Sequence, residues 1–124
     1  MKRIAWLFTL VFACATLSAQ AETLHLYTWA DYISPEVVQK FEKQHGCKVV
    51  IDTFDSNESM YAKLKAGASG YDLLFPTSYM IQVMQADGML TALDHSKLPN
   101  LKNIDPTALS KLPDQTMHHS VPYT

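Results

Sequence analysis

The stretch TLHLYTWADYISPEVVQKFEKQHGCKVVIDTF, residues 23–54, decides the fold of this chain. Leu24 and Leu26 alternate with His25 and Tyr27, which predicts a β-strand over residues 23–28 that enters a loop at position 29. A helix is expected next, because a serine N-cap is followed by a proline at positions 34 and 35, and the helix ends at Gly46. Residues 48–54 contain the apolar run VVI and are predicted to form a second, buried strand.

The residues that follow repeat this alternation of strand and helix. Residues 55–58 have the form of a capping box, in which Asp55 or Ser56 is the cap and Glu58 reaches back, so a second helix is expected to run to about Ala66. Residues 71–75 predict a third strand, and a third helix with apolar positions 80, 81, 83 and 84 ends at Gly88. Recurring prolines after Leu93 predict a winding connection, with one helical turn near residues 106–112 and another strand beginning at residue 120.

This order of elements predicts an α/β fold with a mostly parallel sheet and helices on both faces. In open sheets of this kind, ligands bind where the strands end at their carboxyl edge. The loop at residues 29–32 follows the first strand, and the loop at residues 77–79 follows the third. We therefore expect both loops to lie at the same edge of the sheet.

The N-terminus has the pattern of a secretory signal peptide. Lys2 and Arg3 precede an apolar run over residues 4–17, and the run ends in SAQA, which contains an A-x-A cleavage site. We expect residues 1–21 to be removed on export and residues 22–124 to remain, without direct membrane insertion, since no other apolar segment approaches about 20 residues. The alternatives are a lipoprotein anchored through Cys14 and a buried helix over residues 4–17.

Composition and charge narrow the class of protein further. The 124 residues are 48% hydrophobic and 18% charged, which is typical of a globular chain and excludes a disordered tail. Cleavage would leave eight lysines against 12 acidic residues, a net charge of −4, and no arginine. Such a chain is a poor nucleic-acid binder, because phosphate is neutralised by lysine and arginine. Cys47 would be the only remaining thiol, so no intrachain disulfide is expected.

No motif for catalysis or for a metal is present. The chain lacks G-x-S-x-G, H-E-x-x-H, C-x-x-C and a Walker loop, so we expect a protein that is not an enzyme and has no cofactor. His118 and His119 are adjacent, so their side chains are expected to point apart, and no ligand partner lies at metal-binding spacing. Asp52 is interpreted as a strand end, Asp72 as structural, and Cys47 as a packed thiol.

The two loops at the expected carboxyl edge are equipped for an organic ammonium ion. Trp29, Tyr32 and Tyr79 offer aromatic faces, Asp31 a carboxylate, and Thr77 and Ser78 hydroxyl groups. An aromatic face attracts a cation by about 0.5 to 2 kcal/mol, and a charge-assisted hydrogen bond adds about 1.5 to 3 kcal/mol. Two alternatives stay open: the aromatic residues pack at the sheet edge while Asp31 is a solvated acid or a helix cap, or the helix N-termini favour an oxyanion.

Four motifs together resemble those of the spermidine/putrescine-binding proteins of bacterial polyamine ABC transporters. They are TWADYI at residues 28–33, FDSNE at 54–58, YDL at 71–73 with PTSY at 76–79, and LDHSKL at 93–98. The resemblance implies a periplasmic binding protein with two lobes that closes on its ligand and docks on a membrane permease. Residues 22–124 would then be the first part of the N-terminal lobe, and the second lobe would be absent from this sequence.

The resemblance also implies roles for individual residues. Trp29 and Tyr32 would line the cavity, Asp31 would pair with a ligand amine, and Thr77 and Tyr79 would contribute from the loop after the third strand. Ala30 stands where the family usually has serine or threonine, which leaves the preference between putrescine and spermidine open. The expected function is periplasmic capture of a polyamine and its delivery to an ABC transporter. The alternatives are a binding protein for an oxyanion or sugar and a sensory domain on the same fold.

Overall fold

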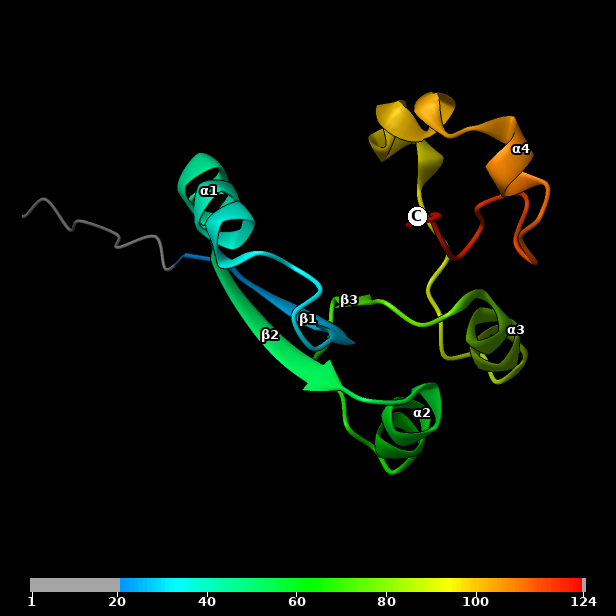
Figure 1. The fold of residues 1–124 in the computed structure, drawn as a ribbon, viewed down its shortest axis with the longest axis horizontal. Coiled ribbons are helices and arrows are strands. Elements are labelled where there is room, and N and C mark those ends of the chain that lie inside the picture. The colour runs from blue at the N-terminus through cyan, green and yellow to red at the C-terminus, as the bar shows by residue number, and fades with distance from the viewer. Residues whose placement is uncertain (1–20, 124) are drawn as a thin grey trace, which may run out of the picture.

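The computed structural model describes residues 21–123 (Figure 1). Almost all of the expected signal peptide, including Cys14, lies outside these residues. The elements follow in the order β1 (Thr23–Trp29), α1 (Pro35–His45), β2 (Lys48–Phe54), α2 (Asn57–Lys65), β3 (Leu73–Leu74) and α3 (Ser78–Ala86). Two 3₁₀ turns, η1 (His95–Lys97) and η2 (Pro99–Asn103), and the short helix α4 (Pro106–Leu109) come after them.

The three strands form one parallel sheet with β1 at its centre, in the order β2-β1-β3. Tyr27 in the middle of β1 is paired with Asp52 of β2 and with Leu74 of β3. The chain moves to one side of β1 through α1 and back to the other side through α2, so right-handed crossovers place the two helices on opposite faces. Figure 1 shows α1 and α2 on opposite sides of the sheet. The predicted α/β class with a parallel sheet is confirmed.

The ends of α1 are those that the sequence predicts. The Ser34 side chain accepts a hydrogen bond from the backbone N–H of Glu36 at 3.3 Å, and Pro35 occupies the first helical position. Gly46 ends the helix with a left-handed φ of 63°, and its N–H donates to the carbonyl of Glu42. No residue of α1 is buried, and Val37 is 60% exposed. The local signals therefore define this helix without a fully buried face.

The predicted capping box of α2 is wrong in one part. Ser56 is the N-cap, and its hydroxyl oxygen accepts from the backbone N–H of Ser59 at 3.0 Å. Ser59 thus occupies the third helical position, where a capping box needs an acidic residue or glutamine. Glu58 lies one position too early to reach back, and its carboxylate instead accepts from the hydroxyl group of Tyr79.

Strand β3 is shorter than the predicted strand at residues 71–75. Its backbone pairing with β1 extends beyond the strand, because the N–H groups of Asp72 and Phe75 donate to the carbonyls of His25 and Tyr27. The Asp72 carboxylate also accepts from the backbone N–H of His25 at 2.8 Å, which agrees with its predicted structural role. The proline at position 76 has no N–H to donate, so regular pairing ends there.

The core lies on one face of the sheet. Its buried members are Tyr27, Phe54, Met60, Met80 and Met84, contributed by β1, β2, α2 and α3. Met60 and Met84 are fully buried. Packing of α2 and α3 against the same aromatic residues fixes the two helix N-termini next to the carboxyl edge of the sheet.

The C-terminal part is organised around a buried carboxylate rather than the predicted strand. Asp114 is 8% exposed and accepts hydrogen bonds from the backbone N–H groups of His118, His119 and Ser120. Burial raises the pKa of Asp114, but these hydrogen bonds outweigh burial and lower it to about 2. Residues 120–123 contain no strand, while the predicted helical turn is present as α4.

Candidate functional site

The loops that follow β1 and β3 meet at the carboxyl edge of the sheet, as predicted. The indole N–H of Trp29 donates to the carbonyl of Phe75 at 2.8 Å. The Trp29 ring also packs on Phe54, with ring centroids 4.5 Å apart. Trp29 therefore ties the two loops together, and its single N–H is already used within the protein.

Asp31 lies in an exposed turn directly after β1. Its φ of 55° lies in the left-handed region, which aspartate tolerates better than most residues. Within residues 21–123 its carboxylate has no hydrogen-bond or ion-pair partner, and Ser34 rather than Asp31 caps α1. The interpretation of Asp31 as a helix cap is therefore wrong. The adjacent Tyr32 is 46% exposed, and its ring centroid lies 5.4 Å from that of Tyr123.

Thr77 and Tyr79 are joined by a residue that the sequence did not single out. The side-chain amide of Asn57 donates to the Thr77 hydroxyl at 2.9 Å and to the Tyr79 hydroxyl at 3.1 Å. Its carbonyl oxygen accepts from the backbone N–H of Thr77 at 3.0 Å. Asn57 is 5% exposed, whereas Tyr79 is 49% exposed. Ser78 is exposed at the start of α3.

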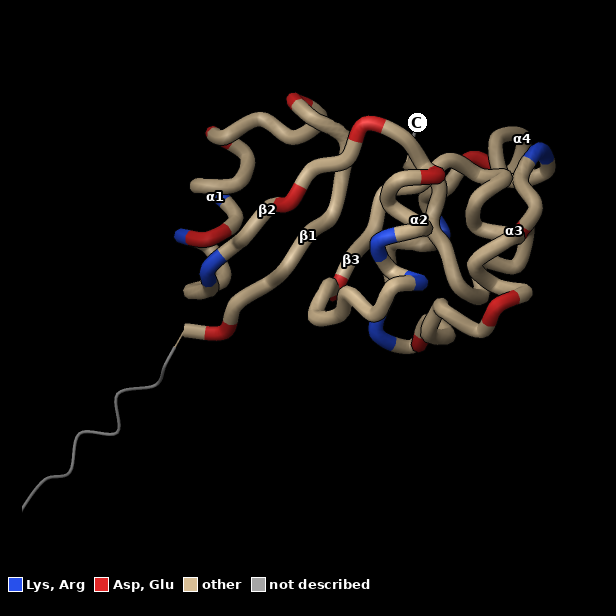
Figure 2. Tube along the Cα trace, turned by 90° about the horizontal axis from the view of Figure 1, so that it is seen from below, with Lys and Arg blue, Asp and Glu red and all other residues tan. Residues whose placement is uncertain are grey.

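The charged side chains on the loops at this edge are all acidic. The three loops at residues 30–34, 55–59 and 75–79 contain Asp31, Asp55 and Glu58 and have no lysine, arginine or histidine. Figure 2 shows acidic positions along the edge at which β1 and β2 end. A depression of about 400 Å³ opens beside them, lined by Tyr27, Ala30, Thr53, Phe54, Asp55 and Ser59. The six predicted binding residues surround the strand ends but do not line this depression.

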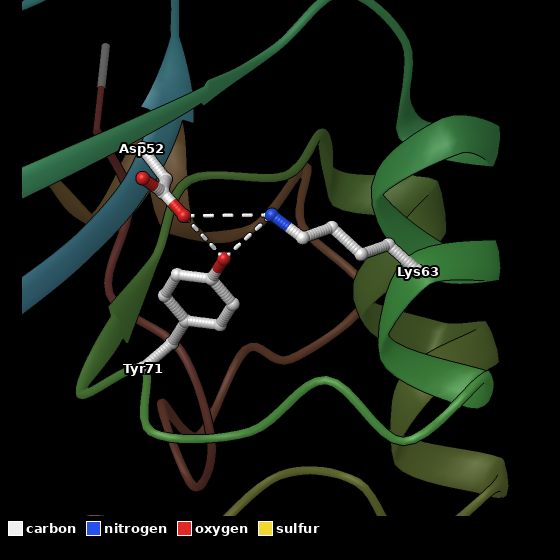
Figure 3. Close-up of polar contacts among 3 residues, drawn as sticks. All are labelled: Asp52, Lys63 and Tyr71. Atoms are coloured by element: carbon white, nitrogen blue, oxygen red, sulfur yellow. Dashed lines mark hydrogen bonds and ion pairs between the residues drawn. The ribbon is translucent and has the colours of Figure 1, made fainter.

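Elsewhere the fold already holds an ammonium group with aromatic rings and a carboxylate. The Lys63 Nζ lies 4.7 Å from the ring centroid of Tyr27. It also lies 2.7 Å from the Tyr71 hydroxyl, as Figure 3 shows. The Tyr71 hydroxyl donates to Asp52 at 2.5 Å. This hydrogen bond lowers the pKa of Asp52, and the contact with Tyr71 raises that of Lys63. The polar groups of this cluster are half-exposed on the α2 side of the sheet, and its cation is a lysine of the protein itself.

The rings of His118 and His119 lie 4.4 Å apart at 88°, so the expectation that they point apart is wrong. Among residues 21–123 no group of three or more histidine, cysteine or acidic side chains could hold a metal ion. Cys47 is a half-buried free thiol. No helix in this range has the length and apolar character needed to cross a membrane.

Comparison with solved structures identifies the class of protein. The spermidine/putrescine ABC transporter substrate-binding protein PotD of Streptococcus pneumoniae matches with 42% identity and a TM-score of 0.69, over 73% of this chain and 28% of that one. The TpPotD lipoprotein of Treponema pallidum matches with 39% identity and a TM-score of 0.79, over 83% and 33%. The fold is therefore that of the substrate-binding proteins of ABC transporters.

Curated relatives identify the family that the chain resembles. The spermidine/putrescine-binding periplasmic protein 1 of Haemophilus influenzae is 39% identical over 98% of this chain and 39% of its own length. The putrescine-binding periplasmic protein PotF of Escherichia coli is 49% identical over 76% and 25%. The chain is thus homologous to the spermidine/putrescine-binding periplasmic proteins, as its motifs predict, and spans less than half the length of these relatives. No family model matches it.

Proposed function

We propose that the protein binds a polyamine, putrescine or spermidine, at the carboxyl edge of this sheet. The observation that carries the proposal is the combination of three carboxylates and no basic residue on the three edge loops with half-exposed aromatic rings beside them. The named ligands of the curated relatives support the same class of ligand.

In this proposal each of the six predicted residues has a role. Asp31, whose carboxylate has no partner among residues 21–123, pairs with one ligand ammonium group. The faces of Trp29 and Tyr32 contact the aliphatic part of the ligand. Thr77, Ser78 and Tyr79 supply hydroxyl groups from the loop that precedes α3 and from its first turn. Because the Trp29 N–H is used by Phe75, Trp29 contributes only its ring.

The proposed cellular role is capture and delivery without chemical conversion. The protein is exported to the periplasm through the cleavable segment 1–21, and residues 22–124 form part of an N-terminal lobe. A second lobe closes over the bound polyamine, and the closed form is recognised by the membrane permease of an ABC transporter. A ligand that contacts both lobes stabilises the closed state by its differential affinity for it.

Calorimetric titration of putrescine, spermidine, sulfate and maltose into the purified protein tests this function. We expect saturable binding of a polyamine and no binding of sulfate or maltose. Asp31→Asn should weaken polyamine binding about 10- to 150-fold, the value of one charge-assisted hydrogen bond. Asp105→Asn, which removes an equal charge from the start of α4, is the matched control and should leave affinity unchanged.

Binding of sulfate instead would support the oxyanion alternative. That alternative has one favourable observation, since Thr77 makes no side-chain capping hydrogen bond at the N-terminus of α3. Failure of both amines to bind would overturn the proposed function.

A further inference from the structure

The hydrogen bonds of Asn57 fix the orientation of its amide group. The backbone N–H of Thr77 can only donate, so the Asn57 atom 3.0 Å from it is the carbonyl oxygen. The other atom is therefore the amino group, which can only donate, to the hydroxyl oxygens of Thr77 and Tyr79. Asn57 is 5% exposed. A buried side-chain amide in one fixed orientation therefore joins α2 to the loop before α3.

The same reasoning fixes the direction of the Tyr79 hydroxyl. Its oxygen accepts from Asn57, and its proton is donated to the Glu58 carboxylate at 2.9 Å, because a carboxylate only accepts. The proton of Tyr79 is therefore committed within the protein. What the hydroxyl still offers to a ligand is a lone pair, which is an acceptor site for an N–H group.

We infer that Asn57 and Glu58 are positioning residues that hold the Tyr79 hydroxyl as a hydrogen-bond acceptor, so that this position selects a ligand with N–H donors. This inference rests on the proposed function, since Tyr79 must meet the ligand. An oxyanion, which needs donors, gains nothing from a hydroxyl group in this state. A primary ammonium group supplies three N–H donors and gains a hydrogen bond.

The two positioning residues differ in burial, so experiments can separate their effects on binding and on folding. Asn57 is buried and joins two elements, so its loss disturbs the fold as well as the hydroxyl. Glu58 is exposed, and its bond to half-exposed Tyr79 contributes little to stability. Changes at Glu58 therefore report on binding with the least effect on folding.

The first experiment is putrescine titration into Glu58→Ala, Glu58→Gln, Tyr79→Phe and the Glu58→Ala/Tyr79→Phe double variant. We expect Tyr79→Phe and Glu58→Ala each to weaken binding about 5-fold, the value of one ordinary hydrogen bond. The double variant should be weaker than Tyr79→Phe alone only by the loss that removal of one edge charge causes in Asp55→Ala, because Glu58 otherwise acts through the hydroxyl. Glu58→Gln should lose no more affinity than Asp55→Ala, since its amide oxygen can still accept the proton of Tyr79.

Asp55→Ala is the matched control, because it removes a carboxylate from the same loop but one that contacts Ser59 rather than Tyr79. Its loss of putrescine affinity measures the removal of one edge charge alone and should be smaller than the loss in Glu58→Ala. Equal losses in Asp55→Ala and Glu58→Ala, or multiplying losses in the double variant, would show that only charge matters and would overturn the inference. Asn57→Asp adds a negative charge and removes the N–H donor to Tyr79. If only charge mattered, this substitution would strengthen putrescine binding, whereas the inference expects weaker binding.

A readout without ligand separates this inference from the proposed function. The ring carbon that bears the hydroxyl of Tyr79, followed by NMR in tyrosine-labelled protein, should shift in Glu58→Ala and stay in place in Asp55→Ala. Absence of putrescine binding by the unmodified protein would overturn the proposed function. The NMR result would still show whether the Tyr79 hydroxyl donates to Glu58. An unmoved Tyr79 signal in Glu58→Ala would overturn the inference whichever ligand the protein binds.

Discussion

Replacing Asp114 by asparagine should destabilise the C-terminal part of the described chain strongly. One carboxylate oxygen accepts from the hydroxyl of Thr116 at 3.1 Å and the N–H of His118 at 3.0 Å. The other accepts from the N–H groups of His119 and Ser120 at 2.8 and 3.0 Å, and from the Ser120 hydroxyl at 3.1 Å. All of these donors converge on one side chain that is 8% exposed.

The expected loss of stability is that of the more favourable of the two orientations of the new asparagine amide. If the amino group of asparagine takes the place of the first oxygen, the Thr116 hydroxyl can turn to accept, but the N–H of His118 faces another donor. A buried N–H without a partner costs about 1 to 3 kcal/mol, and the bonds to His119 and Ser120 lose their charge assistance. We therefore expect Asp114→Asn to lower the free energy of unfolding by about 2 to 3 kcal/mol at pH 7.

Urea unfolding followed by tryptophan fluorescence and circular dichroism measures this difference. The folded pKa of about 2 lies below the ordinary value of 3.8, so the stabilisation is complete above 3.8 and is lost as pH falls toward 2. The difference in the free energy of unfolding between the unmodified protein and Asp114→Asn should therefore decrease in that pH range. Asp105→Asn is the control and should cost well under 1 kcal/mol, because the amide oxygen of asparagine can still accept the single capping bond from the N–H of Thr107. A gap below about 0.5 kcal/mol, or one that does not change with pH, would refute this account of Asp114.

Two further substitutions test the fold. Gly46→Ala should lower the free energy of unfolding by about 1 kcal/mol in a urea titration, because the φ of 63° is strained for alanine. No atom lies within 4 Å of an added Cβ, so a larger loss would mean a clash that the structure does not contain. Lys63→Met should lower the free energy of unfolding only slightly, because the ammonium group is half-exposed, and this loss should shrink in high salt. A salt-independent loss would show that packing on Tyr27 dominates instead.

Local signals predicted most of the fold because they act over a few residues. Ser34, Pro35 and Gly46 define α1 through contacts within one turn, and the helix forms where they place it. The shared edge of the two loops followed from strand order alone and is borne out by the bond from Trp29 to Phe75. These features depend on chain geometry that every parallel α/β unit shares.

The contacts that the sequence did not reveal join residues far apart in the chain. Asn57 meets Thr77 and Tyr79 across 20 and 22 positions, and no local pattern marks an asparagine at a helix start as a link to another loop. The capping-box interpretation also assigned Glu58 a local partner, whereas its position in the first turn directs it to Tyr79. Side chains with two plausible local roles are the ones for which sequence patterns are least informative.

The balance of charge at the carboxyl edge favours a cationic ligand over an anionic one. Three helix N-termini face this edge, at Pro35, Asn57 and Ser78, and each contributes about half a positive charge. Asp31, Asp55 and Glu58 contribute three full negative charges at the same edge, and Glu36 in the first turn of α1 contributes a fourth, so the edge retains a net charge of about −2.5. The two ammonium groups of a diamine offset most of this charge, whereas sulfate nearly doubles it. The helix N-termini, which taken alone favour an oxyanion, are therefore outweighed by the carboxylates beside them.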